Sequence, residues 1–328
     1  DINPLLPAIR PTLLLDFANS LAVDPRITFS RASTATQVNK FGLLELVASG
    51  ASRIDYDPVT LACRGFLTEE ARTNLLLNSV LAGTSLATQS VTVTAVAHTL
   101  SFYGTGTVTL SGTSSGSLVG SGAYPTRSTL TFTPTAGSLT LTVTGSVQFA
   151  QLEVGPSASS FIPTAGATAT RALDVAAMTG SNFTGWYRQD EGSVLVDFVG
   201  PATPSNSRRV VCISDGTANN RIQLIVTSAN VLQSTVTTGG TSTTANHGTL
   251  TPGVRYCVAM GVKVGDVAVS VNGGTVVTSA PASVPAVTQL TLGSGEAAGG
   301  NPINTSMRSF VYYPKRLTNT ELQALSTL

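Results

Sequence analysis

Alternation of apolar and polar positions is the strongest pattern in the chain, and it is clearest in the last third. Over residues 254–263 every second residue is apolar, which predicts a half-buried strand. Valines alternate again over residues 267–271. Asn272 and Gly273 follow, and this pair tolerates the positive φ of a tight turn. The pattern therefore predicts neighbouring antiparallel strands that bury one face.

The end of the chain is predicted to be a long strand followed by a short helix. A glycine-rich run at 293–300 leads to a strand over residues 305–313. Thr318 and Glu321 have the spacing of a capping box, so a helix should begin there with its leucines facing inward.

Similar patterns recur through the rest of the chain. Strands are predicted at 88–96, 99–103, 105–112, 129–132, 138–143, 193–198, 209–214 and 221–226. Turn signals separate them by about 8–12 residues, a spacing typical of antiparallel sandwiches. Prolines break the first part of the chain into short pieces. We therefore predict an all-β fold, with an irregular N-terminal region at 1–80, jelly-roll sandwiches at 81–172 and 173–328, and a short C-terminal helix.

Composition narrows the classes of function. Charged residues make up 11% of the chain and the net charge is +1, which argues against a nucleic-acid partner. No run of about 18 apolar residues is present, so no membrane insertion is expected. Cys63, Cys212 and Cys257 lack the spacing of a metal site. We expect them to be free, with pairing of Cys212 and Cys257 as the alternative.

The sequence contains no recognisable catalytic constellation. The carboxylates are not spaced like the pair of a glycosidase, and His98 and His247 are far apart. Gly-x-Ser-x-Gly matches at 112–116 and 116–120 lie among turn residues without a following helix. The loop that begins at Asp215 has too few acidic residues for calcium. We predict no enzyme activity, no cofactor and no metal.

Aromatic residues in polar, glycine-containing stretches are the candidates for ligand binding. A sugar site combines an aromatic platform with planar polar groups, because the face of a pyranose is apolar. The candidates are Trp186, Tyr187 and Tyr124. The alternative for Trp186 is a structural one, in which it seals the junction between the two sandwiches.

Several segments carry a resemblance to known families. The segments at 29–36, 53–58 and 65–76 resemble the leader of tailed-bacteriophage virion proteins, often tail-fibre or tail-associated ones. Those at 150–155, 160–164 and 170–174 resemble the end of the carbohydrate-binding-module-like sandwich that follows in such proteins. The segments at 267–273 and 310–322 resemble the end of a laminin-G-like or concanavalin A-like domain.

The resemblance implies a protein of the virion surface that is assembled in the host cytoplasm. It implies a homotrimer, attachment to other virion proteins through residues 1–80, and lectin-like modules that contact host-surface polysaccharide. The alternative is a purely structural fibre or capsid decoration without receptor binding. A glycan depolymerase is a third class, which the missing carboxylate pair disfavours.

One polar motif admits two interpretations. Glu69, Glu70 and Arg72 lie between predicted modules, where they could form ion pairs that clamp the modules together. The alternative is a solvated surface turn, in which such pairs contribute little to stability.

Overall fold

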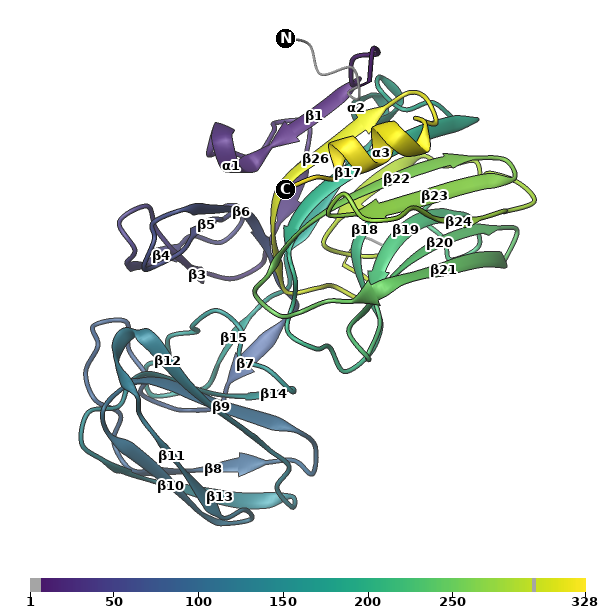
Figure 1. Cartoon of the computed structure of the whole chain (residues 1–328). Coiled ribbons are helices and arrows are strands. Elements are labelled where there is room, and N and C mark those ends of the chain that lie inside the picture. Colours follow the sequence, from purple (N-terminus) through teal and green to yellow (C-terminus); the bar gives the residue numbers. More distant parts are fainter. Residues whose placement is uncertain (1–6, 297–298) are drawn as a thin grey trace.

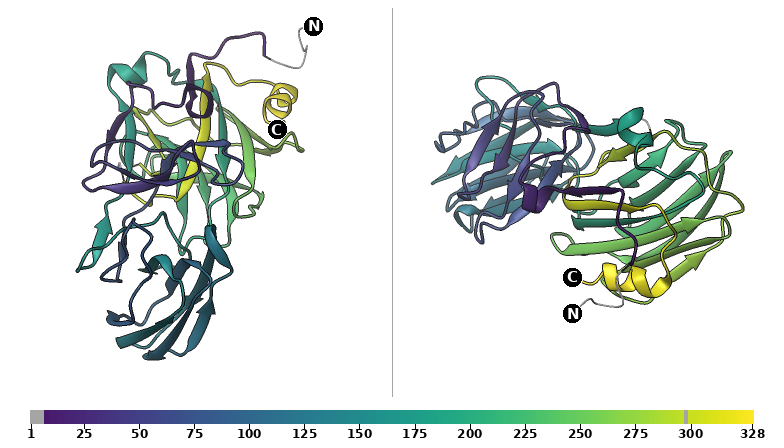
Figure 2. Two further views of the ribbon diagram at one scale, coloured as in Figure 1. Left: turned by 90° about the vertical axis from the view of Figure 1, so that its left-hand side faces the viewer. Right: turned by 90° about the horizontal axis from the view of Figure 1, so that it is seen from above.

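The protein is all-β and consists of two sandwiches joined by a shared region (Figure 1). A computed structural model describes residues 7–296 and 299–328. The predicted fold class is confirmed. Viewed from above, the two sandwiches lie side by side (Figure 2).

The middle sandwich contains seven strands in two antiparallel sheets. One sheet has the order β11-β10-β13-β8 and the other the order β12-β9-β14. The strands are β8 (Gln89–Val93), β9 (His98–Gly104), β10 (Thr107–Gly112), β11 (Gly116–Val119), β12 (Gly122–Phe132), β13 (Gly137–Thr144) and β14 (Gln148–Val154). Their alternating apolar side chains, including Leu100, Phe102 and Leu141, form one buried core between the sheets.

The C-terminal sandwich has an eight-stranded and a seven-stranded sheet. The first has the order β24-β23-β22-β17-β26-β6-β5, and β1 also pairs with β26. The second has the order β2-β16-β25-β18-β19-β20-β21. Its strands from the last half of the chain are β16 (Val175–Thr179), β17 (Glu191–Val199), β18 (Arg208–Ser214), β19 (Arg221–Val226), β20 (Val231–Thr238), β21 (Thr241–Thr249), β22 (Arg255–Lys263), β23 (Asp266–Val271), β24 (Val277–Ser279), β25 (Gln289–Leu292) and β26 (Thr305–Tyr313).

Strands from the first 80 residues complete these two sheets. They are β1 (Leu13–Asp16), β2 (Thr28–Ser30), β5 (Ile54–Tyr56) and β6 (Cys63–Thr68). β1 and β6 both pair with β26, and β2 pairs with β16. Phe17 and Phe66 join the same core as Phe310. The boundaries at 80 and 172 stay predictions, but the N-terminal strands are integral to the C-terminal sandwich.

Short elements fill the space around the sheets. β3 (Ala35–Val38) and β4 (Leu44–Val47) form a separate hairpin, and β7 (Arg72–Asn74) pairs with β15 (Ala169–Arg171) between the sandwiches. Three short helices are described: α1 (Phe17–Ser20), α2 (Ser181–Thr184) and α3 (Asn319–Leu325). None of the described helices is long and apolar enough to cross a membrane.

Several local sequence signals in the last third were accurate, although β22 and β23 are buried on both faces and not on one as predicted. The final strand spans 305–313 as predicted, and Thr318 caps α3 through a capping box with Glu321. Asn272 and Gly273 both have positive φ. Val254 differs from its prediction, because it precedes β22 and is exposed.

The structure also contains strands that the pattern did not indicate, among them β11, β14, β16, β20, β21, β24 and β25. Of the glycine-rich run, residues 297 and 298 lie outside the described residues, as do the first six residues of the N-terminal region. Cys63, Cys212 and Cys257 are free, as expected.

Candidate functional site

A buried cluster of ion pairs lies where the N-terminal region meets both sandwiches. Arg53 Nη1 lies 2.6 Å from Glu69 Oε2, and Arg53 Nη2 lies 2.5 Å from Asp174 Oδ2. Arg31 binds the other oxygen of Asp174 at 3.1 Å, and Arg171 binds Glu69 at 3.0 Å. The side chains of Arg53 and Asp174 are fully shielded from solvent. Removing either partner would leave an uncompensated charge, so the cluster holds its elements together.

The middle sandwich is tied to this cluster through the segment after β14. The Ser160 amide donates to Glu69 Oε1 at 2.8 Å, and the Ser160 hydroxyl donates to Glu69 Oε2 at 2.6 Å. Burial raises the pKa of Glu69, but Arg171 and Arg53 outweigh it and lower that pKa to about 2. Glu69 is therefore ionised and its oxygens are occupied.

The motif that contains Glu69 is a clamp and not a solvated turn. Glu69 is 3% exposed. Glu70 binds Arg72 at 2.5 Å and Arg208 of β18 at 2.7 Å, which extends the ion pairs into the C-terminal sandwich. The predicted ion pairs are confirmed: Glu69 and Glu70 follow β6, and Arg72 begins β7.

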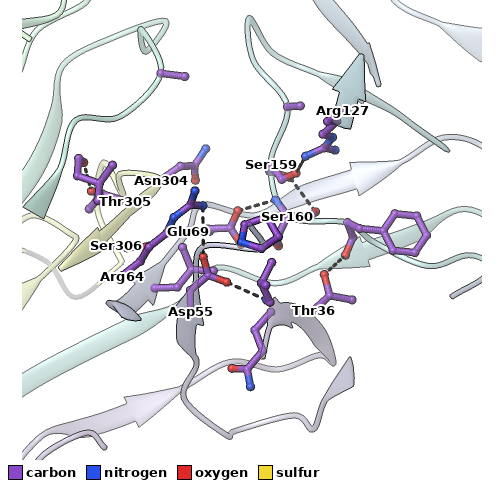
Figure 3. Close-up of a pocket in the computed structure, with 18 of the residues that line it drawn as sticks. Thr36, Asp55, Arg64, Glu69, Arg127, Ser159, Ser160, Asn304, Thr305 and Ser306 are labelled. Carbon is purple, nitrogen blue, oxygen red and sulfur yellow. Dashed lines mark hydrogen bonds and ion pairs between the residues drawn. The ribbon is translucent and has the colours of Figure 1, made fainter. Parts of the chain in front are cut away.

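An open cleft of about 410 Å³ adjoins the buried cluster, because Glu69 and Ser160 also line the cleft (Figure 3). All three parts of the chain contribute to its walls. Asp55 and Arg64 come from the N-terminal region, Tyr124 and Arg127 from β12, and residues 304–306 from β26 and the segment before it. The volume lies in the range of small-ligand sites.

Asp55 is the acidic group with an oxygen free for a ligand in this cleft. Its Oδ1 accepts the Val38 amide at 2.8 Å, and its Oδ2 lies 3.9 Å from Arg64 Nη1. Burial raises the pKa of Asp55 to about 6. Asp57 differs, because amides of Thr60 and Val59 lower its pKa to about 2.

Tyr124 lies in the wall of the cleft, as a ligand-binding aromatic should. Its ring centroid is 5.1 Å from that of Tyr103, and its hydroxyl donates to the Gly42 carbonyl at 2.7 Å. Burial raises the pKa of Tyr124 to about 12, so the phenol is neutral. Arg127 donates to the Ser159 carbonyl at 2.7 Å, and the side chain of Arg64 is 41% exposed.

Trp186 and Tyr187 lie elsewhere, inside the C-terminal sandwich. Trp186 is 5% exposed and packs against Phe183 and Tyr312, and its indole nitrogen donates to the Asn182 carbonyl at 2.7 Å. Tyr187 stacks on Phe183 with centroids 4.7 Å apart, and burial raises its pKa. Their ring faces are covered by protein.

The structural alternative for Trp186 also needs correction. Trp186 belongs to the core of the C-terminal sandwich and packs near α2 and β26, not at the junction of the two sandwiches. The alternative placed Trp186 at the junction, but Phe183, Tyr187 and Tyr312 surround its ring inside the C-terminal sandwich. Of the three candidates, the structure brings only Tyr124 to the cleft.

Sequence reasoning missed Asp55, Arg64 and Arg127 as possible ligand-binding residues. The segment 53–58 was noticed as a family marker, and its Asp55 faces the cleft. No sequence motif marked Arg127 as a binding residue. Its position in the cleft depends on the pairing of β12 with β9, which could not be predicted from the sequence alone. The two histidines lie in different sandwiches, and the described residues contain no group of three or more metal-binding side chains.

Comparisons with known proteins give only distant matches. No protein-family model and no curated protein matches the sequence. The CBM40 module of the Ruminococcus gnavus IT-sialidase, solved with α2,3 sialyllactose, matches with a TM-score of 0.38 and 16% identity, covering 43% of this chain and 84% of that one.

Whole sialidases match over a small part of their length. NanB sialidase from Streptococcus pneumoniae has a TM-score of 0.38 and 14% identity over 46% of this chain and 26% of its own. Leech intramolecular trans-sialidase has a TM-score of 0.36 and 12% identity over 43% of this chain and 24% of its own. Likeness at this level establishes neither a family nor an activity for the chain.

Proposed function

We propose that this chain is a non-enzymatic, glycan-binding surface protein of a tailed-phage virion, and that it holds saccharide in the cleft between its modules. The observation that carries the proposal is the chemistry of that cleft. Asp55 Oδ2 offers an acceptor for sugar hydroxyls, and Arg64 beside it offers donors. Tyr124 and three prolines supply apolar surface. This combination of apolar walls and a few convergent polar groups suits a saccharide.

The same geometry favours binding over hydrolysis. Glycoside cleavage commonly needs two carboxyl groups that act on one bond. Glu69 also lines the cleft, but Arg53, Arg171 and Ser160 occupy its oxygens and hold it ionised. Asp55 is then left without a second free carboxylate among the lining residues.

Placement on a virion is supported by the resemblance of the motifs and by where those motifs meet. The buried cluster is built from the segments at 29–36, 53–58, 65–76, 160–164 and 170–174. The first four of these segments also contribute residues to the walls of the cleft. A junction fixed by buried ion pairs suits a part that must project modules in a constant orientation. The proposal includes a homotrimer, attachment to other virion proteins through the N-terminal region, and assembly in the host cytoplasm.

Binding of the purified full chain to surface polysaccharides tests the proposal. A panel of extracted bacterial polysaccharides is titrated by calorimetry, and each mixture is then assayed for new reducing ends. We expect saturable binding to one polysaccharide, competed by its own oligosaccharides, with no new reducing ends. Absence of binding across the panel would contradict glycan recognition, and released reducing ends would make the chain a depolymerase.

The rigid junction also favours a second candidate, a purely structural fibre or capsid decoration. Its specific support is that the ion cluster connects all three parts of the chain without needing a ligand. A decoration predicts attachment to virions together with no saccharide binding. Imaging of particles with and without the protein separates this candidate from the adhesin.

A further inference from the structure

Large apolar side chains gather at the tips of two N-terminal hairpins. Phe41 and Leu43 lie in the β3–β4 turn and are 68% and 58% exposed, and Val59 in the β5–β6 turn is 74% exposed. The two tips touch, because a Cβ on Gly42 would lie 2.9 Å from Leu61 Cδ2. Residues 39–43 and 58–61 thus form one continuous surface, which we name the tip surface. In Figure 1 the hairpins stand at the side of the C-terminal sandwich.

A cleft of about 470 Å³ lies beside the tip surface. Leu21, Val23, Ile54 and Tyr56 form its apolar wall, and Phe41 stands at the same cleft. A protruding aromatic ring and an apolar hollow therefore occur together on one face. The ring of each copy can enter the hollow of its neighbour, and three copies can repeat this contact around a threefold axis, as in the proposed homotrimer.

The strand β4 beside the tip surface also has an edge that no described strand pairs with. β3 and β4 form a two-stranded sheet, and none of the described strands pairs with the outer edge of β4. A free edge offers unpaired N–H and C=O groups to another chain. A hairpin of two strands is also marginally stable unless something packs against it.

The charges at this face indicate what kind of partner fits. Lys40 and Glu45 both line the cleft, so the face carries one cation and one anion. Lys40 Nζ lies over the Phe41 ring, 5.1 Å from its centroid. A partner that covers this ring would therefore also contact the ammonium group. A polyanion or an anionic membrane would require an excess of positive charge. A second copy instead brings a carboxylate for Lys40 and an ammonium for Glu45.

We propose that the tip surface and its adjoining cleft bind a second copy of this chain, with Phe41 as the central anchor. This inference rests on the self-association included in the proposed function and assigns the surface that produces it. Buried aromatic residues near the centre of an interface commonly dominate its stability. The unpaired edge of β4 and the exchange of Lys40–Glu45 pairs fix the orientation of the two copies.

The mass of the full chain in solution tests the surface. Sedimentation equilibrium is measured for wild type, for Phe41→Asp, and for Val119→Asp as a control. Val119 is 63% exposed but belongs to the middle sandwich. We expect wild type and the control to sediment at a multiple of the chain mass, and Phe41→Asp to weaken association at least about tenfold. Circular dichroism confirms that each variant is folded.

A charge exchange provides a second test that does not depend on Phe41. Lys40→Glu should weaken association, and Lys40→Glu combined with Glu45→Lys should restore it. A wild type that stays a single chain at every concentration would overturn both the surface and the proposed self-association. An oligomer that persists in Phe41→Asp and in Lys40→Glu would overturn the surface alone.

Discussion

The guanidinium of Arg53 and the carboxylate of Asp174, 121 residues apart in the sequence, lie 2.5 Å apart with neither side chain exposed. This pair joins the N-terminal region to the segment that enters the C-terminal sandwich. Through Glu69 and Ser160 the same guanidinium reaches the middle sandwich. One buried arginine therefore connects all three parts of the chain, and its partners Glu69 and Ser160 line the cleft.

Asp174→Asn should destabilise the protein strongly. The change leaves the buried guanidinium of Arg53 with an incomplete set of anionic partners, which costs about 3–5 kcal/mol. Urea unfolding measures the loss. Asp190→Asn is the matched control, because Asp190 pairs with Arg188 on the surface, where the change should cost little stability. Equal losses in the two variants would show that the buried cluster is not a clamp.

The stability of the fold should fall in acid because of Glu69. Its carboxyl has a pKa of about 2 when folded, against an ordinary value of 4.5 for a glutamate side chain. Since the folded pKa is the lower one, the stability it contributes is present above pH 4.5 and is lost as the pH falls toward 2. Urea midpoints between pH 7 and pH 2 should therefore depend less on pH in Glu69→Gln than in wild type. Identical pH dependence in both would contradict the ion pairs.

Asp55 should titrate near pH 6, far above its neighbour Asp57. Burial raises the pKa of Asp55 to about 6, while amide hydrogen bonds lower that of Asp57 to about 2. The folded pKa of Asp55 lies above the ordinary aspartate value of 3.8. Ionised Asp55 therefore costs stability above pH 6, and this cost disappears as the pH falls to 3.8. Carbon NMR of the two carboxyl groups measures both midpoints. Similar midpoints would mean that Asp55 is solvated.

Gly65→Ala should disrupt the attachment of β6 to β26. Gly65 has a φ of 97°, and a Cβ there would lie 2.1 Å from the Met307 carbonyl oxygen. We expect a loss of more than about 3 kcal/mol, beyond the usual range for one substitution. Gly50→Ala is the control, with a φ of 74° and open space around it, and should cost about 1–2 kcal/mol. Thermal unfolding compares them, and equal melting temperatures would contradict the close packing.

Local features of the fold were predictable from sequence, whereas the junction was not. The capping box of Thr318 and Glu321 and the turn at Asn272 depend on residues a few positions apart. The cluster around Arg53 joins residues up to 121 positions apart. The sequence motifs that contain these residues could be recognised, but the contacts between them could not be predicted. The motif at Glu69 did suggest a clamp, and the structure shows which residues it joins.

Burial explains why the aromatic candidates were mostly misplaced. The glycines and polar residues around Trp186 indicated an exposed loop, but Phe183, Tyr187 and Tyr312 enclose its ring. Tyr124 lay in a similar stretch and does reach the cleft, because β12 pairs with β9 and places its ring beside Tyr103. The residues that flank Trp186 and Tyr124 in the sequence are similar. They therefore did not indicate which ring would be buried in the core and which would line the cleft.

Saccharide binding by Arg64→Ala tests the central claim most directly, since Arg64 faces the cleft and its side chain is 41% exposed. Arg188→Ala is the control, because Arg188 is 48% exposed and forms a similar surface pair outside the cleft. Calorimetric titration with the polysaccharide that wild type binds should show affinity reduced at least about tenfold in Arg64→Ala and unchanged in Arg188→Ala. Undiminished affinity in Arg64→Ala, with both variants folded, would contradict binding in the cleft.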